Sequence, residues 1–240
     1  MRLSELQVLD HGFVRVVDYM GTDKRVVDTA RLSYHKTEFE EPFNAKDERL
    51  VNFLAEHQHT TPFRHCMVSL LIKAPEFVMR QWYKHAVGAS WQTEGSSDTP
   101  WNEMSQRFKE VPLEFYTPKR FKAQDLVNKQ SAGAPLGAAA QGNCEDAYNS
   151  TLRAVRKAYT SLLEEGVARE QARLILPLSV YTTAQWTVSL QALAHFVKLR
   201  KAGDAQAEIC EYATAIEKLV AQLFPVSWKA LLGENNGPTP

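Results

Sequence analysis

The order of the predicted elements constrains the fold more than any other feature of this sequence, because strands come early and long helices come late. Residues 13–17 (FVRVV) follow an Asp-His-Gly turn and predict a first strand. Residues 66–73 (CMVSLLIK) form a continuous apolar run, ended by Ala-Pro, that predicts a buried strand. Helical periodicity dominates from residue 143 onward. Strands followed by helices are typical of an α+β domain, and we expect this fold class.

Helical spacing of apolar residues predicts the other elements. A short helix is expected at 23–32 and a second at 47–56, with Asn44 as its N-cap. Pro75 opens a further helix with the sequence EFVMRQWYKHAV. Pro225 and the tail GENNGPTP are expected to end the ordered part. Four later helices are predicted, at 143–165, 168–175, 182–201 and 205–223.

The length and charge of the chain limit both its domain number and its ligands. A length of 240 residues suits one hydrophobic core, so we expect a single domain over 1–240. Two loop insertions are expected in it: the Gly- and Ser-rich segment 87–101, and a mobile, partly helical segment at 120–142. The 28 Lys and Arg balance the 28 Asp and Glu, which argues against a bulk nucleic-acid binder. Any anionic ligand must therefore be held by a local cluster of cations.

Several classes of protein and site are disfavoured. No apolar run reaches the about 18 residues of a membrane span, and the amino terminus lacks the apolar segment of a secretion signal. The three scattered cysteines, with no Cys-x-x-Cys pair, fit a reducing cytoplasm and form no zinc site. The histidines of 57–65 lack metal-ligand spacing, so we expect no metal. Rossmann and P-loop glycine patterns are both missing.

The densest polar grouping joins RQWYKH at 80–85 to NEMSQR at 102–107. A helix would present a face of three donors to a phosphate or a heterocycle: Gln81, Lys84 and His85. An extended segment would point three side chains the same way: Glu103, Ser105 and Arg107. On residue types alone, a solvated helix face followed by a capping box explains this pattern too. Arg173 and Arg200 end or interrupt apolar runs, where they are either ligand contacts or ordinary helix cations.

RQWYKH followed by WNEMSQRF resembles the signature of the flavin-dependent thymidylate synthases, in which an Arg-His-Arg element precedes an Asn-Glu-x-Ser-x-Arg-Tyr element. The resemblance runs from about residue 8 to 230 through DHGFVRVVDYMGTD, ARLSY, HTTPFRHCMVSLLIKAPEFV, LEFYTP, AREQARLILPLSVYT and WTVSLQALAHFVKLR. It implies an α+β domain with a small sheet and several long helices, in a cytoplasmic homotetramer whose sites are shared between subunits. It also implies reductive methylation of dUMP to dTMP, with methylene-tetrahydrofolate as carbon donor and FAD and NADPH as reductant.

The resemblance also implies roles for individual residues. Flavin-contacting positions are held by Ser33, Thr61, Arg64, Lys84, His85, Ala86, Glu103 and His195. Positions around dUMP are held by Gln81, Lys84, Glu103, Ser105, Gln106, Arg107, Arg173 and Arg200. His59 matches a position near the folate. Arg200 is the expected catalytic residue, because a cation there would stabilise the negative charge on the uracil as N3 loses its proton.

Three departures from the family pattern leave alternatives open. The Arg-His-Arg element reads Lys84-His85-Ala86, so one cation is gone and another lacks the planar fork of arginine. The link between the two halves of the signature is longer, and late Asn and Arg positions read Ser189, Gln191 and His195. The alternatives are C5 methylation or hydroxymethylation of another pyrimidine nucleotide such as UMP, or an inactive nucleotide-binding protein with the same fold.

Overall fold

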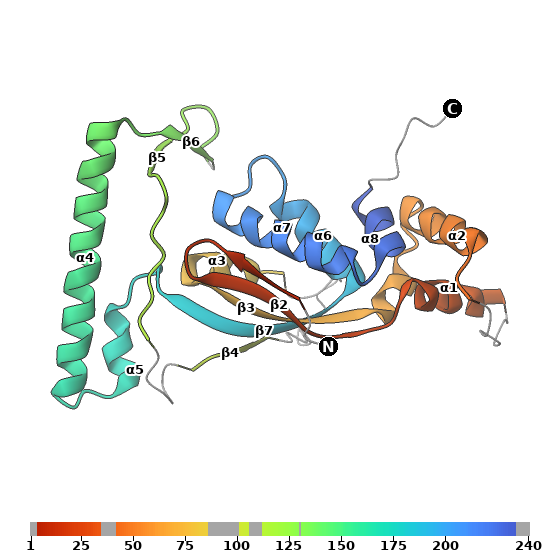
Figure 1. Ribbon diagram of the computed structural model, residues 1–240, viewed down its shortest axis with the longest axis horizontal. Helices are drawn as coiled ribbons and strands as arrows, with labels where there is room; N and C mark the ends of the chain where they lie inside the picture. Colours follow the sequence, from red (N-terminus) through yellow and green to blue (C-terminus); the bar gives the residue numbers. More distant parts are fainter. Residues whose placement is uncertain (1–3, 35–41, 86–100, 106–111, 130, 234–240) are drawn as a thin grey trace.

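The computed structural model describes residues 4–34, 42–85, 101–105, 112–129 and 131–233. Within these residues, a five-stranded sheet with the strand order β1-β2-β3-β7-β4 forms the centre of the molecule (Figure 1). All neighbouring strands in it are antiparallel. Its strands are β1 (Glu5–Val8), β2 (Gly12–Met20), β3 (Met67–Pro75), β4 (Trp101–Glu103) and β7 (Tyr181–Ser189).

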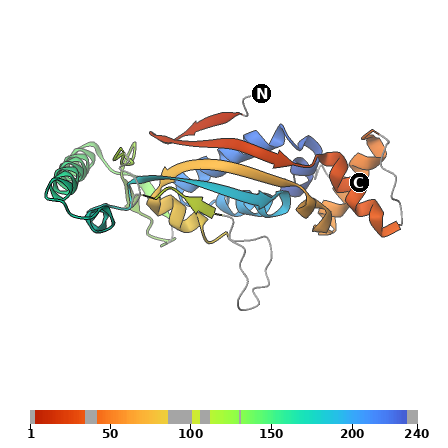
Figure 2. The same cartoon turned by 90° about the horizontal axis from the view of Figure 1, so that it is seen from below.

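Helices lie against one face and both ends of this sheet. In Figures 1 and 2, α6 and α7 cover the face, α1, α2 and α8 gather at one end, and α4 stands beyond the other end. The α-helices are α1 (Asp23–Arg31), α2 (Ala45–Glu56), α3 (Glu76–Trp82), α4 (Ala138–Glu164), α5 (Arg169–Ala172), α6 (Leu190–Arg200), α7 (Ala207–Ala221) and α8 (Pro225–Leu232). The described residues also form three 3-10 helices, η1 (Leu32–Tyr34), η2 (Thr61–His65) and η3 (Arg173–Ile175), and a hairpin of β5 (Lys122–Gln124) and β6 (Ala132–Pro135).

The core lies between the sheet and the helices. Alternate residues of β3 are fully buried, namely Val68, Leu70, Ile72 and Ala74, as the two-residue period of a strand requires. Trp82 of α3 stacks on Phe196 of α6 with ring centroids 4.8 Å apart, and its edge meets Trp186 of β7 at 5.8 Å. These rings tie α3, α6 and β7 together, and so position the segments that follow α3 and end α6.

The opposite face of the sheet is polar at its centre. Gln185 and Thr187 of β7 both donate hydrogen bonds to the Ser69 hydroxyl of β3, at 2.9 and 3.0 Å. Arg15 and Met20 of β2 are exposed on either side of a bulge. This face is therefore suited to contact with water or with another protein surface.

Most of the predicted elements, and the α+β class, are confirmed. The helix expected at 47–56 is α2, and Asn44 caps it as predicted: its side chain accepts from the amides of Lys46 and Asp47, at 2.9 and 3.4 Å. Asp47 accepts from the Asn44 amide at 3.2 Å, which completes a capping box. The expected segment 168–175 is α5 followed by η3, and 205–223 contains α7.

The helix predicted over 182–201 is wrong in its first half. Residues Tyr181–Ser189 form β7, which lies between β3 and β4 in the sheet, and the helix begins only at Leu190. The sequence YTTAQWTVS is rich in β-branched and aromatic residues that suit a strand, and pairing on both sides decides its conformation. Ser189 ends the strand and caps α6, since its hydroxyl accepts from the Ala192 amide at 3.3 Å.

Two predictions about loops and ends also need correction. Pro225 does not end the ordered part; it is the first residue of α8, whose amide groups at Val226 and Ser227 donate to buried Asp23 at 3.0 and 2.8 Å. The segment 120–142 contains the β5–β6 hairpin as well as the first residues of α4. Most of the predicted loop 87–101 lies outside the described residues. That the chain forms one domain over 1–240 stays a prediction.

Candidate active site

Arg200 and His85 meet where the end of α6 approaches the segment after α3. The Arg200 Nε–H donates to His85 Nε2 at 2.9 Å, and another guanidinium nitrogen contacts the Gln81 carbonyl oxygen at 3.5 Å. The edge of the His85 ring packs against Phe196 at 4.9 Å and 89°. Burial, and then the positive charge of Arg200 and the neighbouring His195, lower the pKa of His85 to about 4.

The hydrogen bond between Arg200 and His85 fixes the tautomer of His85 and the orientation of Arg200. Because Nε2 accepts the hydrogen bond, the neutral imidazole carries its proton on Nδ1 at physiological pH. The guanidinium of Arg200, half-buried, has its plane oriented by the bond at Nε. Gln81, one turn earlier on α3, donates from its amide to the Gln206 side chain just before α7. Arg200, His85 and Gln81 therefore form a connected polar cluster between α3 and α6.

A second polar cluster surrounds Glu103 at the end of β4. The Thr182 hydroxyl on β7 donates to a Glu103 carboxylate oxygen at 2.7 Å. The Glu76 side chain, at the start of α3, is hydrogen-bonded to Glu103, and burial followed by the charge of Glu103 raises the pKa of Glu76 to about 7. Arg80 and Arg173 act on Glu76 in the opposite direction, so both cations lie close enough to stabilise its ionised form. The carboxyl groups of Glu76 and Glu103 thus lie together, with the cations Arg80 and Arg173 close to Glu76.

A third set of predicted residues lies toward the other end of α6. Arg64 of η2 donates from Nε to the Gln191 side chain at 3.1 Å, and Thr61 begins the same short helix. His195 is exposed one turn after Gln191. Since a helix rises about 1.5 Å per residue, α6 places the Arg64 contact roughly 13 Å from Arg200. Ser33, in η1, is exposed.

The described residues thus bring together part of the predicted site. Gln81, His85 and Arg200 lie together, with His195 close enough for its charge to act on His85. Glu103 lies with Glu76, on which the charge of Arg173 also acts. The helix predicted to run past His85 ends at Trp82, so Lys84 and His85 lie beyond α3 and do not share a helical face with Gln81; Lys84 is exposed. Ser105 is half-buried two residues after Glu103. His59 is exposed, with its ring edge toward Phe53 at 6.0 Å. Three predicted residues lie outside the described residues: Ala86, Gln106 and Arg107.

Sequence reasoning missed three residues of this region: Glu76, Thr182 and Gln206. Glu76 had a usable signal, because a carboxylate directly after the buried strand's terminal Ala-Pro is unusual in an apolar stretch. Thr182 was hidden by the wrong prediction of a helix over its segment. Gln206 carried no signal, since only the fold brings it to Gln81.

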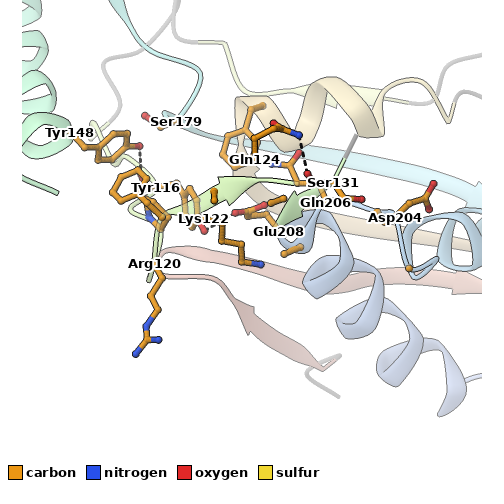
Figure 3. A pocket seen from close by; sticks show the side chains of 18 residues that line it. Tyr116, Arg120, Lys122, Gln124, Ser131, Tyr148, Ser179, Asp204, Gln206 and Glu208 are labelled. Atoms are coloured by element: carbon orange, nitrogen blue, oxygen red, sulfur yellow. Dashed lines mark hydrogen bonds between the residues drawn. The ribbon is translucent and has the colours of Figure 1, made fainter. Parts of the chain in front are cut away.

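A cavity of about 660 Å³ lies between the β5–β6 hairpin and the segment that joins α6 to α7 (Figure 3). Tyr116 donates to Glu208 at 3.0 Å, and Tyr148 donates to the Tyr116 carbonyl at 2.6 Å, so these rings are held as part of its wall. Gln206 lines the cavity and also accepts from Gln81. The cavity therefore borders the Arg200 cluster, although none of the predicted site residues within the described ranges lines it.

In the described part of the chain, no three histidine, cysteine, aspartate or glutamate side chains are grouped so that they could hold a metal ion. No described helix combines the length and apolar character needed to cross a membrane. Cys66 is buried, and burial raises its pKa to about 11, so its thiol stays protonated and is a poor nucleophile.

Comparisons with known proteins agree on one family. A family model described as thymidylate synthase complementing protein matches residues 15–226. The flavin-dependent thymidylate synthase of Thermus thermophilus is 41% identical over 232 residues, which is 94% of this chain and 77% of that protein. The one from Thermosipho africanus is 38% identical, covering 95% of this chain and 94% of that protein.

The fold agrees with this assignment. The crystal structure of the UMP/dUMP methylase PolB from Streptomyces cacaoi, bound with 5-Br dUMP, superposes with a TM-score of 0.78 at 27% identity. The match covers 95% of this chain and 97% of that one. From the matched residues 15–226 and the identity along nearly its whole length, the chain belongs to the flavin-dependent thymidylate synthase family.

Proposed function

We propose that this protein methylates dUMP to dTMP reductively, with methylene-tetrahydrofolate as carbon donor and FAD and NADPH as reductant. The observation that carries the proposal is the Arg200–His85–Gln81 cluster, in which the expected catalytic arginine is oriented by a neutral histidine. The relatives at 35–41% identity are named thymidylate synthases, which favours dUMP. The structural neighbour is named a UMP/dUMP methylase, so UMP is the second candidate substrate.

Arg200 has the chemistry needed to activate the pyrimidine. The C5 carbon of uracil becomes nucleophilic when N3 is ionised, and a guanidinium stabilises the resulting negative charge on the ring. Arg200 is half-buried, where charge–charge interactions are stronger than in water. His85 accepts from its Nε–H and one terminal nitrogen contacts the Gln81 carbonyl oxygen, and the remaining N–H groups of the terminal nitrogens are assigned to the ring. The buried thiol of Cys66 takes no part in this chemistry.

The phosphate and ribose of the nucleotide require donors beside Arg200. Glu103 is held by Thr182 and suits a sugar hydroxyl, as a carboxylate that accepts hydrogen bonds. Ser105 follows it by two residues, and Arg173 adds a cation near the same carboxylates. We assign the phosphate to Ser105, Gln106, Arg107 and Arg173, because hydrogen bonds from cations to phosphate are among the strong ones.

The residues assigned to the flavin fit an anionic cofactor with an aromatic ring. Arg64, Lys84 and His195 supply cations and donors suited to a diphosphate, while Ala86 adds no polar side chain. We assign the flavin contacts to Ser33, Thr61, Arg64, Lys84, His85, Ala86, Glu103 and His195, and a folate contact to His59. When bound, FAD supplies the hydride that it receives from NADPH.

We further propose a cytoplasmic homotetramer with sites shared between subunits. Arg64, Lys84 and His195 are each exposed on this chain, so they are open to contact with a second subunit. The 27-residue helix α4 has one buried residue, Tyr159, and stands beyond the end of the sheet (Figure 1). A long helix with so little burial in its own chain is typical of an intersubunit contact. Light scattering on the purified protein tests the tetramer.

The function is tested by tritium release from 5-tritiated dUMP in the presence of FAD, NADPH and methylene-tetrahydrofolate. Release that depends on all three, with dTMP as the product, is the expected result, and parallel assays with 5-tritiated UMP measure the preference. Release from UMP alone would replace dUMP by UMP as the substrate. A flavin-loaded protein that releases tritium from neither nucleotide would refute the enzymatic function.

A further inference from the structure

Glu76 is a carboxylic acid placed beside Glu103 by the register of the sheet. Ala74 of β3 pairs with Thr182 of β7, and Glu103 of β4 pairs with Ala184, two residues further along β7. Alternate residues of a strand share a face, so Thr182 and Ala184 lie on one side of the sheet, and Glu103 lies on that side too. Glu76 follows Ala74 by two residues, and its amide donates to the Val180 carbonyl at 2.9 Å.

The carboxyl group of Glu76 lies against that of Glu103. Their side chains are hydrogen-bonded, and two adjacent carboxylates repel, so the ionisation of one disfavours that of the other. Thr182, which is 1% exposed, donates to a Glu103 carboxylate oxygen and fixes where that oxygen lies. Glu76 is half-buried, and burial is the largest cause of its raised pKa, so Glu76 holds its proton more strongly than an exposed glutamate does.

In the described part of the chain, side chains from three elements face this pair. Arg80 comes from α3 and Tyr83 is the residue that caps its end, Arg173 comes from η3, and Thr182 comes from β7. The two arginines favour ionisation of Glu76, whereas burial and Glu103 oppose it more strongly and raise its pKa to about 7. The Glu76 carboxyl group therefore gains and loses its proton within the physiological pH range.

We propose that Glu76 is a positioning residue, whose protonated carboxyl donates a hydrogen bond to Glu103 and holds it, together with Thr182, in the orientation that binds the nucleotide. The inference rests on the proposed placement of Glu103 in the nucleotide site. When Glu76 loses its proton, the donor is lost and a second negative charge appears beside a dianionic nucleotide. Nucleotide binding then weakens with rising pH, while the chemical step at Arg200, in the other cluster, keeps its rate.

The test compares Glu76→Gln, Glu76→Ala and the parent protein, all loaded with FAD. Glutamine keeps a donor toward Glu103 without titrating, alanine removes the donor, and Glu56→Gln at the exposed end of α2 is the matched control. The dissociation constant for dUMP is measured by calorimetry from pH 6 to 8.5, and KM and kcat by tritium release. Ratios of variant to parent cancel the titration of the nucleotide itself.

For the parent protein and Glu56→Gln, we expect the dissociation constant to rise above pH 7 by up to about tenfold per pH unit. For Glu76→Gln, we expect that rise to disappear. For Glu76→Ala, we expect about tenfold weaker binding already at pH 6, with kcat within about twofold of the parent, as loss of one hydrogen bond to a charged group implies. An unchanged pH profile in Glu76→Gln, or parent-like binding by Glu76→Ala at pH 6, overturns the role of Glu76 alone. A parent protein that binds neither dUMP nor UMP overturns the proposed function, and this inference with it.

Discussion

The hydrogen bond between Arg200 and His85 makes a prediction about stability against pH. His85 has a pKa of about 4 in the folded protein and about 6.5 in the unfolded chain. As pH falls below 6.5, the unfolded state takes up a proton that the folded state does not, so acid favours unfolding. The stability associated with neutral His85 is therefore complete above pH 6.5 and is lost progressively as pH falls toward 4.

The size of this effect follows from the surroundings of the imidazole. A change from 6.5 to about 4 corresponds to about 3 kcal/mol of linked free energy. His85 is only part-buried, so solvent screens the interaction, and we expect about 1–2 kcal/mol. Glutamine at this position keeps an acceptor for the Arg200 Nε–H and does not titrate. Alanine removes the acceptor and leaves a half-buried donor unpaired, at a cost of about 1–3 kcal/mol at any pH.

The assay is urea unfolding followed by tryptophan fluorescence at pH 7.5 and pH 4.5, at one fixed protein concentration. Between these pH values, the parent protein should lose about 1–2 kcal/mol more of its free energy of unfolding than His85→Gln does. His85→Ala should be less stable than His85→Gln at pH 7.5. Equal losses in the parent and in His85→Gln would show that His85 is not a neutral acceptor in the folded state, and the reasoning on Arg200 would fail with it.

Three further substitutions probe the site and its support. Arg200→Ala should lower kcat by about 10²–10³-fold, because a stabilising donor for developing charge is lost, while flavin absorbance after gel filtration stays unchanged; an unaltered kcat would remove Arg200 from the mechanism. Asp23→Ala should lower the free energy of unfolding in urea by about 2–4 kcal/mol, since this carboxylate is 8% exposed and accepts from two amides at the start of α8. A change below about 0.5 kcal/mol, roughly the scatter of surface substitutions, would refute this capping role. Gly12→Ala should cost about 1–3 kcal/mol, because its Cβ would lie 2.0 Å from the Tyr212 hydroxyl and 2.7 Å from the Lys73 carbonyl; adding Tyr212→Phe should relieve part of this, and a neutral Gly12→Ala would contradict the close approach.

Local chemistry in the sequence determined the elements that depend on neighbours along the chain. The capping box at Asn44, the buried strand ended by Pro75 and the start of the helix after Pro75 all follow from residues within one or two turns. That helix ends at Trp82, so the prediction that it also carries His85 was wrong. The motifs RQWYKH and WNEMSQRF, with the flanking blocks in the same order, pointed to the family for the same reason, since each motif is a local pattern. Arg200 was also identified from the sequence as a candidate site residue, although the sequence did not show which side chains lie beside it.

The tertiary structure alone decided which distant residues act on one another. The segment 181–189 is a strand because β3 and β4 pair with it on both sides, and no periodicity within the segment reports those partners. That strand brings Thr182 to Glu103, and the packing of Trp82 on Phe196 brings His85 to Arg200 across 115 residues of sequence. The pKa values of His85 and Glu76 depend on burial and on charges supplied by other elements, which only the folded chain assembles. Residue types in the sequence therefore determined what chemistry is available, and the pairing of the strands determined where it is used.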